Sequence, residues 1–350
     1  MTAHYKTFGL LAALTLLQAS TGFKKQQGNM GGHGINQRLS EYAFFTGPLA
    51  DLQPAPGVFP YEVNAPLFSD YAEKARLISL PPGAKMVYHP DASFEYPVGA
   101  AIIKNFFYWH DAAHPEKGRR IIETRVLLKE TKGWKALAYI WNREQTDAVL
   151  EVAGATTPVT WQTASGKKQE FAYTVPNVNQ CKGCHSYDGQ FIPIGTTSRQ
   201  LNLSLPNHEN QLVAFQKWGI LDLPEGFDPA TSPYLSDYRK PGDTERAARA
   251  YLDGNCAHCH NPHGPASTSG MFLGAEVQDP EQLGIRKPPV AAGRGSGNRK
   301  YGIVPGKPSE SILLYRMEHN DPGIRMPELG RQLMHEEGVE LIKNWIREMN

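Results

Sequence analysis

All four cysteines of the chain belong to two copies of one five-residue pattern. The copies are Cys181-Lys182-Gly183-Cys184-His185 and Cys256-Ala257-His258-Cys259-His260. Two thiols at this spacing can add to the two vinyl groups of a porphyrin, and the adjacent histidine can give its imidazole to the iron. The pattern therefore predicts two haem c groups. The predicted attachment residues are Cys181, Cys184, Cys256 and Cys259, and the predicted iron ligands are His185 and His260.

Two other chemistries use paired cysteines. Four thiolates could bind zinc, but the two trailing histidines would then have no role, and the pairs lie farther apart than in a zinc ribbon. A thioredoxin-like redox pair sits between a strand and a helix of a βαβ unit, which neither copy does. Haem attachment is the preferred interpretation, and zinc is the alternative.

The second iron needs a further axial ligand if its haem transfers electrons, and methionine opposite histidine raises the reduction potential. Met326 lies in a turn-rich loop before the last predicted helix, so we predict that it binds this iron. Met334 is the next choice. Met317 lies in an apolar run that favours a core role, and Met271 follows the second motif too closely to reach the far side of the haem.

The first motif has no such partner, because no methionine occurs between His185 and Met271. Its iron must take a histidine, another group from the β-rich part, or no second ligand. An open position would permit peroxide or small-molecule chemistry, whereas a second histidine would favour electron relay. The histidines within reach are His208, His89, His110 and His114, and for each a surface or capping role is the simpler interpretation.

Composition limits the partners of the chain. Its 350 residues carry 36 Lys and Arg against 35 Asp and Glu, a net charge of +1. This balance gives no global field for a nucleic-acid backbone or an anionic membrane, so no nucleic-acid partner is expected. The high content of Gly and Pro predicts many turns and counts against a long helical bundle.

The first residues predict export. Residues 1–22 have the three parts of a signal peptide, with Lys6 before an apolar run over 8–17 and small residues after it. The run is too short to cross a bilayer as a helix. We expect this segment to be removed, with no membrane span in the mature protein and a periplasmic or otherwise exported location, where haem c is assembled. Residues 23–38 are a polar linker.

The fold class predicted for the rest is α+β, with a β-rich domain followed by a mostly α-helical, cytochrome c-like haem region. Residues 39–176 form the β-rich domain, because segments 101–108, 120–129, 134–141 and 168–175 alternate in polarity. Residues 177–240 hold the first haem segment. Residues 241–350 form the second haem domain, and helical spacing occurs over 207–220, 243–252 and 336–349.

The order of elements from 243 to 350 is helix, haem motif, irregular loop, Met-Pro and terminal helix, which resembles a class I cytochrome c domain. The resemblance implies that the helices around 247–251 and 341–346 cross and cover one haem edge, with Trp345 and Tyr315 as packing residues. Distinctive strings occur at 64–72, 96–99, 193–195, 199–202, 255–260 and 326–330. Together they are similar to a family of exported bacterial dihaem c-type cytochromes of uncharacterised function, found beside parallel β-helix repeat proteins. Membership implies two haems c and no known substrate.

Two further features have simpler explanations. Strings 96–99 and 103–106 resemble the cytochrome P460 and β-type cytochrome c′ group, which implies contact between Lys104 and the first haem, although a strand lysine normally faces solvent. A stretch without acidic residues could attract an acidic redox partner, but a solvated loop is the simpler interpretation. Its cations are Arg286, Lys287, Arg294, Arg299, Lys300 and Lys307.

The sequence thus predicts a periplasmic dihaem cytochrome that transfers electrons between redox partners of unknown identity. The alternative is a dihaem oxidoreductase, peroxidase-like or a small-molecule oxidase, with an open coordination site at the first haem. A zinc-organised structural protein is a third hypothesis. The sequence leaves open whether the chain is an enzyme.

Overall fold

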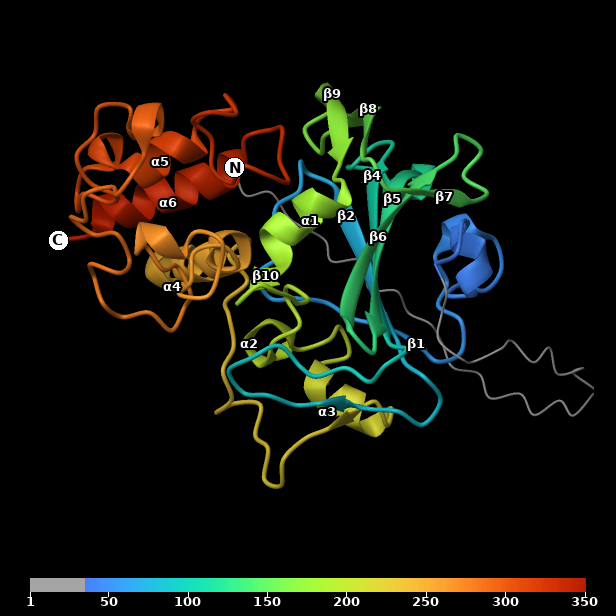
Figure 1. Ribbon diagram of the computed structural model, residues 1–350. Helices are drawn as coiled ribbons and strands as arrows, with labels where there is room; N and C mark the ends of the chain where they lie inside the picture. Colours follow the sequence, from blue (N-terminus) through green and yellow to red (C-terminus); the bar gives the residue numbers. More distant parts are fainter. Residues whose placement is uncertain (1–34) are drawn as a thin grey trace, which may run out of the picture.

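A computed structural model describes residues 35–350. The predicted signal peptide, 1–22, and most of the predicted linker lie outside the described residues. The fold is α+β, as predicted, and is built around one six-stranded antiparallel sheet (Figure 1). In spatial order its strands are β1 (Val58–Pro60), β2 (Glu73–Ser79), β4 (Ala101–Trp109), β5 (Arg119–Glu130), β6 (Gly133–Trp141) and β7 (Ala148–Glu151).

The sheet confirms the strands expected from alternation. The predicted segments 101–108, 120–129 and 134–141 correspond to β4, β5 and β6 to within one residue at each end. A two-residue turn, Thr131-Lys132, joins β5 to β6, since Glu130 pairs with Gly133. The fourth segment is β9 (Lys168–Val175), which forms a separate hairpin with β8 (Ala155–Gln162).

Both faces of the sheet are covered. On one face, Ile103, Val126 and Tyr139 belong to a core packed against the first residues of the described chain. On the other face, Ile102 and Leu127 pack against residues from the middle of the chain. Alternate residues of a strand point to the same face of the sheet. A polar residue two positions after a buried residue of this second face therefore also points inward.

The other strand pairs are short. The strands β10 (Ser186–Tyr187) and β11 (Gln190–Phe191) form a hairpin, and β12 (Leu221–Asp222) pairs in parallel with β3 (Met86–Val87). The α-helices are α1 (Val178–His185), α2 (Ser198–Leu201), α3 (Gln211–Lys217), α4 (Thr244–Leu252), α5 (Ile312–Met317) and α6 (Glu336–Glu348). A π-helical turn, η4 (Asp253–Ala257), continues α4. Short 3₁₀ turns are η1 (Leu39–Tyr42), η2 (Leu49–Asp51), η3 (Pro115–Lys117), η5 (Ser267–Ser269), η6 (Gly293–Ser296) and η7 (Pro308–Glu310).

Two of the three predicted helices have the expected bounds. Helix α4 begins after Asp243, whose carboxylate accepts the Arg246 amide hydrogen at 2.7 Å, and α6 covers the predicted 336–349 segment. The third, predicted over 207–220, is shorter, because His208 has a positive φ of 65° and Asn210 caps the helix instead.

The helices α4, α5 and α6 share a core of buried residues that includes Leu252, Leu314, Ile342, Trp345 and Ile346. The indole of Trp345 also donates to Glu245 of α4, so α4 and α6 are held together by a hydrogen bond as well as by packing. Helix α1, with the first cysteine motif, lies between this helical group and the sheet (Figure 1). Within residues 35–350, no helix has the length and apolar character needed to cross a membrane.

Candidate functional site

The first motif occupies helix α1. Asn177 and Gln180 form a reciprocal cap, since each side-chain oxygen accepts the other residue's amide hydrogen at 2.9 Å. At the other end of the helix, His185 Nδ1 lies 2.7 Å from the carbonyl oxygen of Ile192. A carbonyl only accepts, so Nδ1 carries the hydrogen and the Nε2 lone pair is available to a metal. Burial lowers the pKa of His185 to about 3, which keeps the imidazole neutral.

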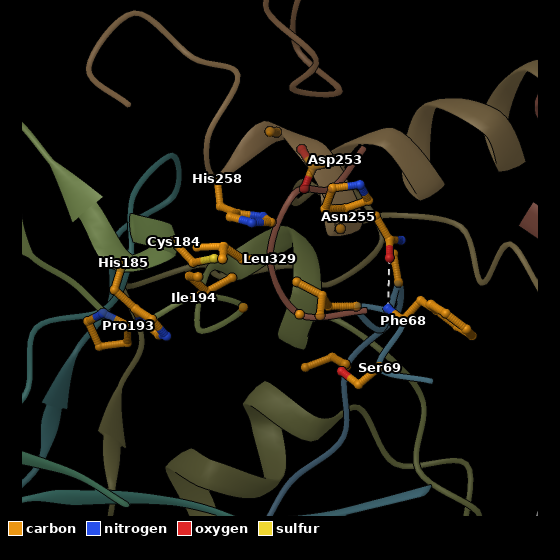
Figure 2. A pocket seen from close by; sticks show the side chains of 18 of the residues that line it. Phe68, Ser69, Cys184, His185, Pro193, Ile194, Asp253, Asn255, His258 and Leu329 are labelled. Atoms are coloured by element: carbon orange, nitrogen blue, oxygen red, sulfur yellow. Dashed lines mark hydrogen bonds between the residues drawn. The ribbon is translucent and has the colours of Figure 1, made fainter. Parts of the chain in front are cut away.

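The second motif begins in η4, immediately after α4. Asn255 fixes its position, because its amide donates to the Tyr251 carbonyl at 2.9 Å and its oxygen accepts the Phe68 amide hydrogen at 2.7 Å (Figure 2). Gly254 approaches the backbone closely, and a Cβ there would overlap the carbonyl oxygen of Ala65. His260 repeats the arrangement of the first motif, since its Nδ1 lies 3.2 Å from the Met271 carbonyl oxygen.

The two motifs meet in space although 75 residues separate Cys184 from Cys259 in the chain. The Cys259 thiol lies 3.7 Å from the carbonyl oxygen of Gly183. Ligand atoms of Cys184, His258 and Cys259 all lie within 4.8 Å of one another, and Figure 2 shows His258 beside Cys184. Hydrogen bonding from Cys259 lowers the pKa of Cys184 to about 5. Cys181 and Cys256 are outside this group, so the four thiols do not form one zinc site.

A cavity of about 730 Å³ borders both motifs. This volume is in the range of cofactor pockets, roughly 300–1,000 Å³. One wall is the second face of the sheet, with Ile102, Phe106 and Leu127, and the first motif supplies Cys181, Cys184 and His185. The opposite wall contains Phe68 and the loop before α6. The cavity therefore combines apolar walls with thiols and an imidazole.

The loop before α6 carries Met326, the predicted ligand of the second iron. Met326 lines the cavity together with His185, whereas His260 is not among its lining residues. The Glu328 carboxylate of the same loop acts on the pKa of Cys259 and of His260 in the second motif. Leu329 of this loop approaches Gly183 of the first motif, since a Cβ there would lie 3.1 Å from its side chain, so the loop lies near both motifs. The pairing of Met326 with His260 remains a prediction. The alternatives Met317 and Met334 pack in or against the C-terminal core, and so does Met271.

The distinctive string at 64–72 holds this loop in place. Asp70 Oδ1 accepts the amide hydrogens of Gln332 and Leu333, both at 2.7 Å. The Tyr71 hydroxyl donates to Glu337 and accepts the Glu336 amide hydrogen. Asp70 and Tyr71 both have a positive φ, of 51° and 62°, which is uncommon for an aromatic residue. The N-terminal half of the chain thus positions the loop that carries Met326.

None of the four histidines considered for the first iron lines the cavity. His89 pairs with Glu95 and His114 with Glu116, and His110 and His208 are exposed on loops. Besides His185, the described histidines that line it are His258, His263 and His335. Sequence reasoning did not single these out, because the first two stand inside and just after the second motif and the third precedes a helix as an ordinary N-cap residue.

His335 connects the two halves of the molecule. Its ring stacks on Phe68 with centroids 4.2 Å apart, and its Nδ1 lies 3.2 Å from the Tyr251 hydroxyl. Burial lowers the pKa of His335 to about 4, so the neutral form is favoured.

The expectation that Lys104 faces solvent is wrong. Lys104 lies between Ile102 and Phe106 on β4, and all three line the cavity. Its ammonium donates to the Ile194 carbonyl at 3.4 Å, and burial lowers its pKa to about 7. The alternation of β4 was visible in the sequence. What the sequence did not show was that α1 and the loop before α6 cover this face.

The basic stretch lies apart from the cavity, since none of its six cations lines it. Three of them pair with acidic side chains outside the stretch or at its edge, namely Lys287 with Glu281, Arg294 with Asp321 and Lys307 with Glu310. Arg299 stacks over Tyr315 at 4.0 Å. These contacts reduce the charge available to attract a partner.

Comparison of the chain with protein-family models, with curated proteins and with solved structures gives no match.

The donor set fits haem c. Each motif holds its trailing histidine with Nδ1 on a backbone carbonyl, and all four thiols are free of disulfides. The first motif also borders an apolar cavity of suitable size. Nδ1 of His258 is buried without a hydrogen-bond partner among the described residues, so a polar group beside the cavity remains to be satisfied.

Proposed function

We propose that this protein is an exported dihaem c-type cytochrome that transfers electrons between redox partners. The observation that carries the proposal is the repeated geometry of the trailing histidines. In both motifs a backbone carbonyl accepts a hydrogen bond from Nδ1 of the histidine. The lone pair of Nε2 is therefore available to bind iron, and each motif also has two free thiols. Free thiols and an oriented imidazole are the requirements of covalent haem attachment.

The roles of the chain's residues follow from this arrangement. Cys181 and Cys184 would attach the first haem, with His185 as its axial ligand. The second haem would be held by Cys256, Cys259 and His260. Haem iron supplies one-electron chemistry when bound, and the protein supplies ligands, apolar walls and a fixed separation of the two sites.

Met326 would complete the second site as a methionine ligand. Support comes from its position on an irregular loop at the cavity, held by the Asp70 hydrogen bonds. The packing of α4 against α6 through Trp345 is what a class I cytochrome c-like arrangement requires of these two helices, so we propose that arrangement for 241–350.

The contact between the motifs supports direct electron exchange between the two haems. The Cys259 thiol and the Gly183 carbonyl are 3.7 Å apart, so the attachment points belong to one connected site. An electron could then enter at one haem and leave at the other without a further cofactor. The partners would be redox proteins outside the cytoplasm.

Intact mass and ligand binding test the proposal. Exported protein is expected to carry the added mass of two haems, and its reduced visible spectrum should survive acid–acetone extraction. Carbon monoxide should leave both haems unchanged if both irons have two axial ligands. If carbon monoxide, cyanide or peroxide shifts half of the Soret absorbance, the electron-relay function is replaced by the oxidoreductase alternative with an open first haem. Protein without haem would contradict both.

A second candidate function rests on the close group of Cys184, His258 and Cys259. Two thiols and an imidazole within 4.8 Å of one another are a suitable donor set for zinc. In that case the chain would be a metal-organised protein without a redox role. Metal analysis separates the two candidates, because zinc without iron supports this one and iron in a ratio of two per chain supports the first.

A further inference from the structure

Three cations form one row across the sheet beside the cavity. Arg76 of β2 is directly opposite Lys104 of β4, and Lys104 is directly opposite Arg125 of β5. All three line the cavity, as does Lys74, two residues before Arg76 on the same strand. Like charges directly opposite each other in a sheet repel and destabilise it. The row is therefore a cost to the fold unless something in the cavity compensates it.

Among the described residues, acidic side chains form ion pairs with the row only at its ends. Arg76 pairs with Glu62 at 3.3 Å. Arg125 pairs with the fully buried Glu123, which also accepts from the Tyr173 hydroxyl. Within residues 35–350, neither Lys104 in the middle nor Lys74 forms an ion pair. Their ammonium groups donate to backbone carbonyls, and that of Lys74 also lies 5.8 Å from the centroid of the Phe106 ring.

Of the five carboxylates that line the cavity, four are engaged elsewhere, and the fifth, Asp91, is exposed. Asp70 accepts two backbone amide hydrogens of the loop before α6. Asp253 and Glu276 both pair with Arg199, and Glu328 pairs with Arg316. The two lysines thus face the cavity without an ion-pair partner among the described residues, and only the Glu73 carboxylate acts on Lys74 from nearby. Burial lowers the pKa of both to about 7, as expected for ammonium groups without an anion beside them.

We infer that the row of Arg76, Lys104 and Arg125, extended by Lys74, binds an oxyanion inside the cavity. Arginine forks and lysine ammonium groups are the usual partners of carboxylates and phosphates. The row is adjacent to the first motif, since Arg125 and Lys104 both act electrostatically on His185. The anion therefore sits at the first site, not the second.

Two sources offer this chemistry. One is a propionate of the first haem, in which case the inference rests on the proposed function. The other is a soluble oxyanion, which would make the cavity an entry site for an anionic reactant next to the first iron. Both sources place an oxyanion at this row of cations, and the experiment distinguishes a haem propionate from a soluble anion.

The test uses full-length exported protein and the variant Lys104→Met, which keeps the apolar stem and removes the charge. Lys135→Met is the matched control, because Lys135 lies in β6 of the same sheet but pairs with Glu130 away from the cavity. Removing one of three like charges relieves repulsion, so the Lys104 variant is expected to fold. Intact mass is measured first. Protein that does not carry two haems contradicts the proposed function, and the phosphate titration then tests the anion site by itself.

Inorganic phosphate at constant ionic strength is the probe of a soluble anion. Calorimetric titration is expected to show binding to wild type and to the Lys135 control, and binding about tenfold or more weaker to the Lys104 variant. If phosphate does not bind wild type, the pH profile of the haem reduction potentials tests the propionate. For one haem of the Lys104 variant, the reduction potential should begin to fall at a higher pH than in wild type. The control should show no such change. Neither effect in the Lys104 variant would overturn the inference.

Discussion

The two cysteine motifs have the same spacing but different surroundings. The first occupies a capped helix beside a cavity whose far wall is a sheet with three cations in one row. The second continues α4 through a π-helical turn, with Cys256 packed against the C-terminal core. Burial in this apolar surrounding raises the pKa of Cys256 to about 12. An identical attachment pattern can therefore serve two sites with different access and charge.

The difference predicts different properties for the two proposed haems. The row of cations lies beside the first motif, whose two cysteines and histidine all line the cavity. Of the second motif only Ala257 and His258 line it, and Cys256 packs against the apolar C-terminal core. A ligand or reactant from solvent should reach the first site more readily. The second site is suited to a stable second axial ligand such as Met326.

Removal of each cysteine pair is expected to have the largest effect. The variants Cys181→Ala/Cys184→Ala and Cys256→Ala/Cys259→Ala should each lose one haem, as measured by intact mass. Only the first variant should keep the weak absorption band of a methionine-ligated ferric haem, at roughly 695 nm. If the band survives instead in the second variant, Met326 binds the iron of the first haem, and the properties expected of the two sites are exchanged.

The substitution Met326→Leu sharpens this assignment. It keeps an apolar side chain of similar volume, so the fold should be retained while one iron loses its thioether. We expect loss of the same band, a lower potential of one haem and new sensitivity to carbon monoxide. Met334→Leu, half-buried in the same segment, is the control and should change none of these. An unchanged spectrum for Met326→Leu would disprove the ligand.

Low pH is expected to lower the free energy of unfolding through protonation of His335, which lies on the side of the second motif. Its folded-state pKa of about 4 lies below the usual 6.5, so the unfolded chain binds more protons between these values. Stability attributable to His335 is present above pH 6.5 and is lost as the pH falls toward 4, by roughly 2–3 kcal/mol. Denaturant unfolding of His335→Gln should show a correspondingly smaller loss over this range. His208→Gln, at an exposed position, should retain the wild-type dependence.

Substitution of two asparagines compares how much hydrogen bonds near each motif contribute to stability. Asn255 is buried and bonds to both Tyr251 and Phe68, so Asn255→Ala should cost about 1–3 kcal/mol. Asn177 caps α1, and Asn177→Ala should cost about 1 kcal/mol. Both are measured by guanidinium unfolding of the haem-loaded protein. A larger loss for Asn177→Ala would mean that the first motif, not the second, depends more on its hydrogen bonds.

The strands β4, β5 and β6 and the helices α4 and α6 were predictable because their apolar periodicity is local. The position before the helical segment left Asp243 and Thr244 as candidate caps, and the structure has Asp243 in that role. The spacing of the cysteines and trailing histidines indicates haem attachment because haem chemistry requires that spacing, and the attachment itself remains a prediction. These features depend on residues close together in the sequence.

The surroundings of the site were not predictable in this way. Lys104 lies on an ordinary alternating strand, and only the covering of that face by distant segments turns it toward a cavity. His335 reaches the site because Phe68, far earlier in the chain, stacks on it. Contacts of this kind depend on tertiary packing, which leaves no periodic signal in one sequence.

The two hydrogen bonds of Asp70 have a practical consequence for engineering. They join positions 262 and 263 residues apart and fix the segment that carries Met326. A fragment starting at residue 241 would contain the thioether and the second attachment motif but would lack the acceptor for both amides. Transplanting this proposed redox unit into another scaffold therefore requires the 64–72 turn to be grafted with it.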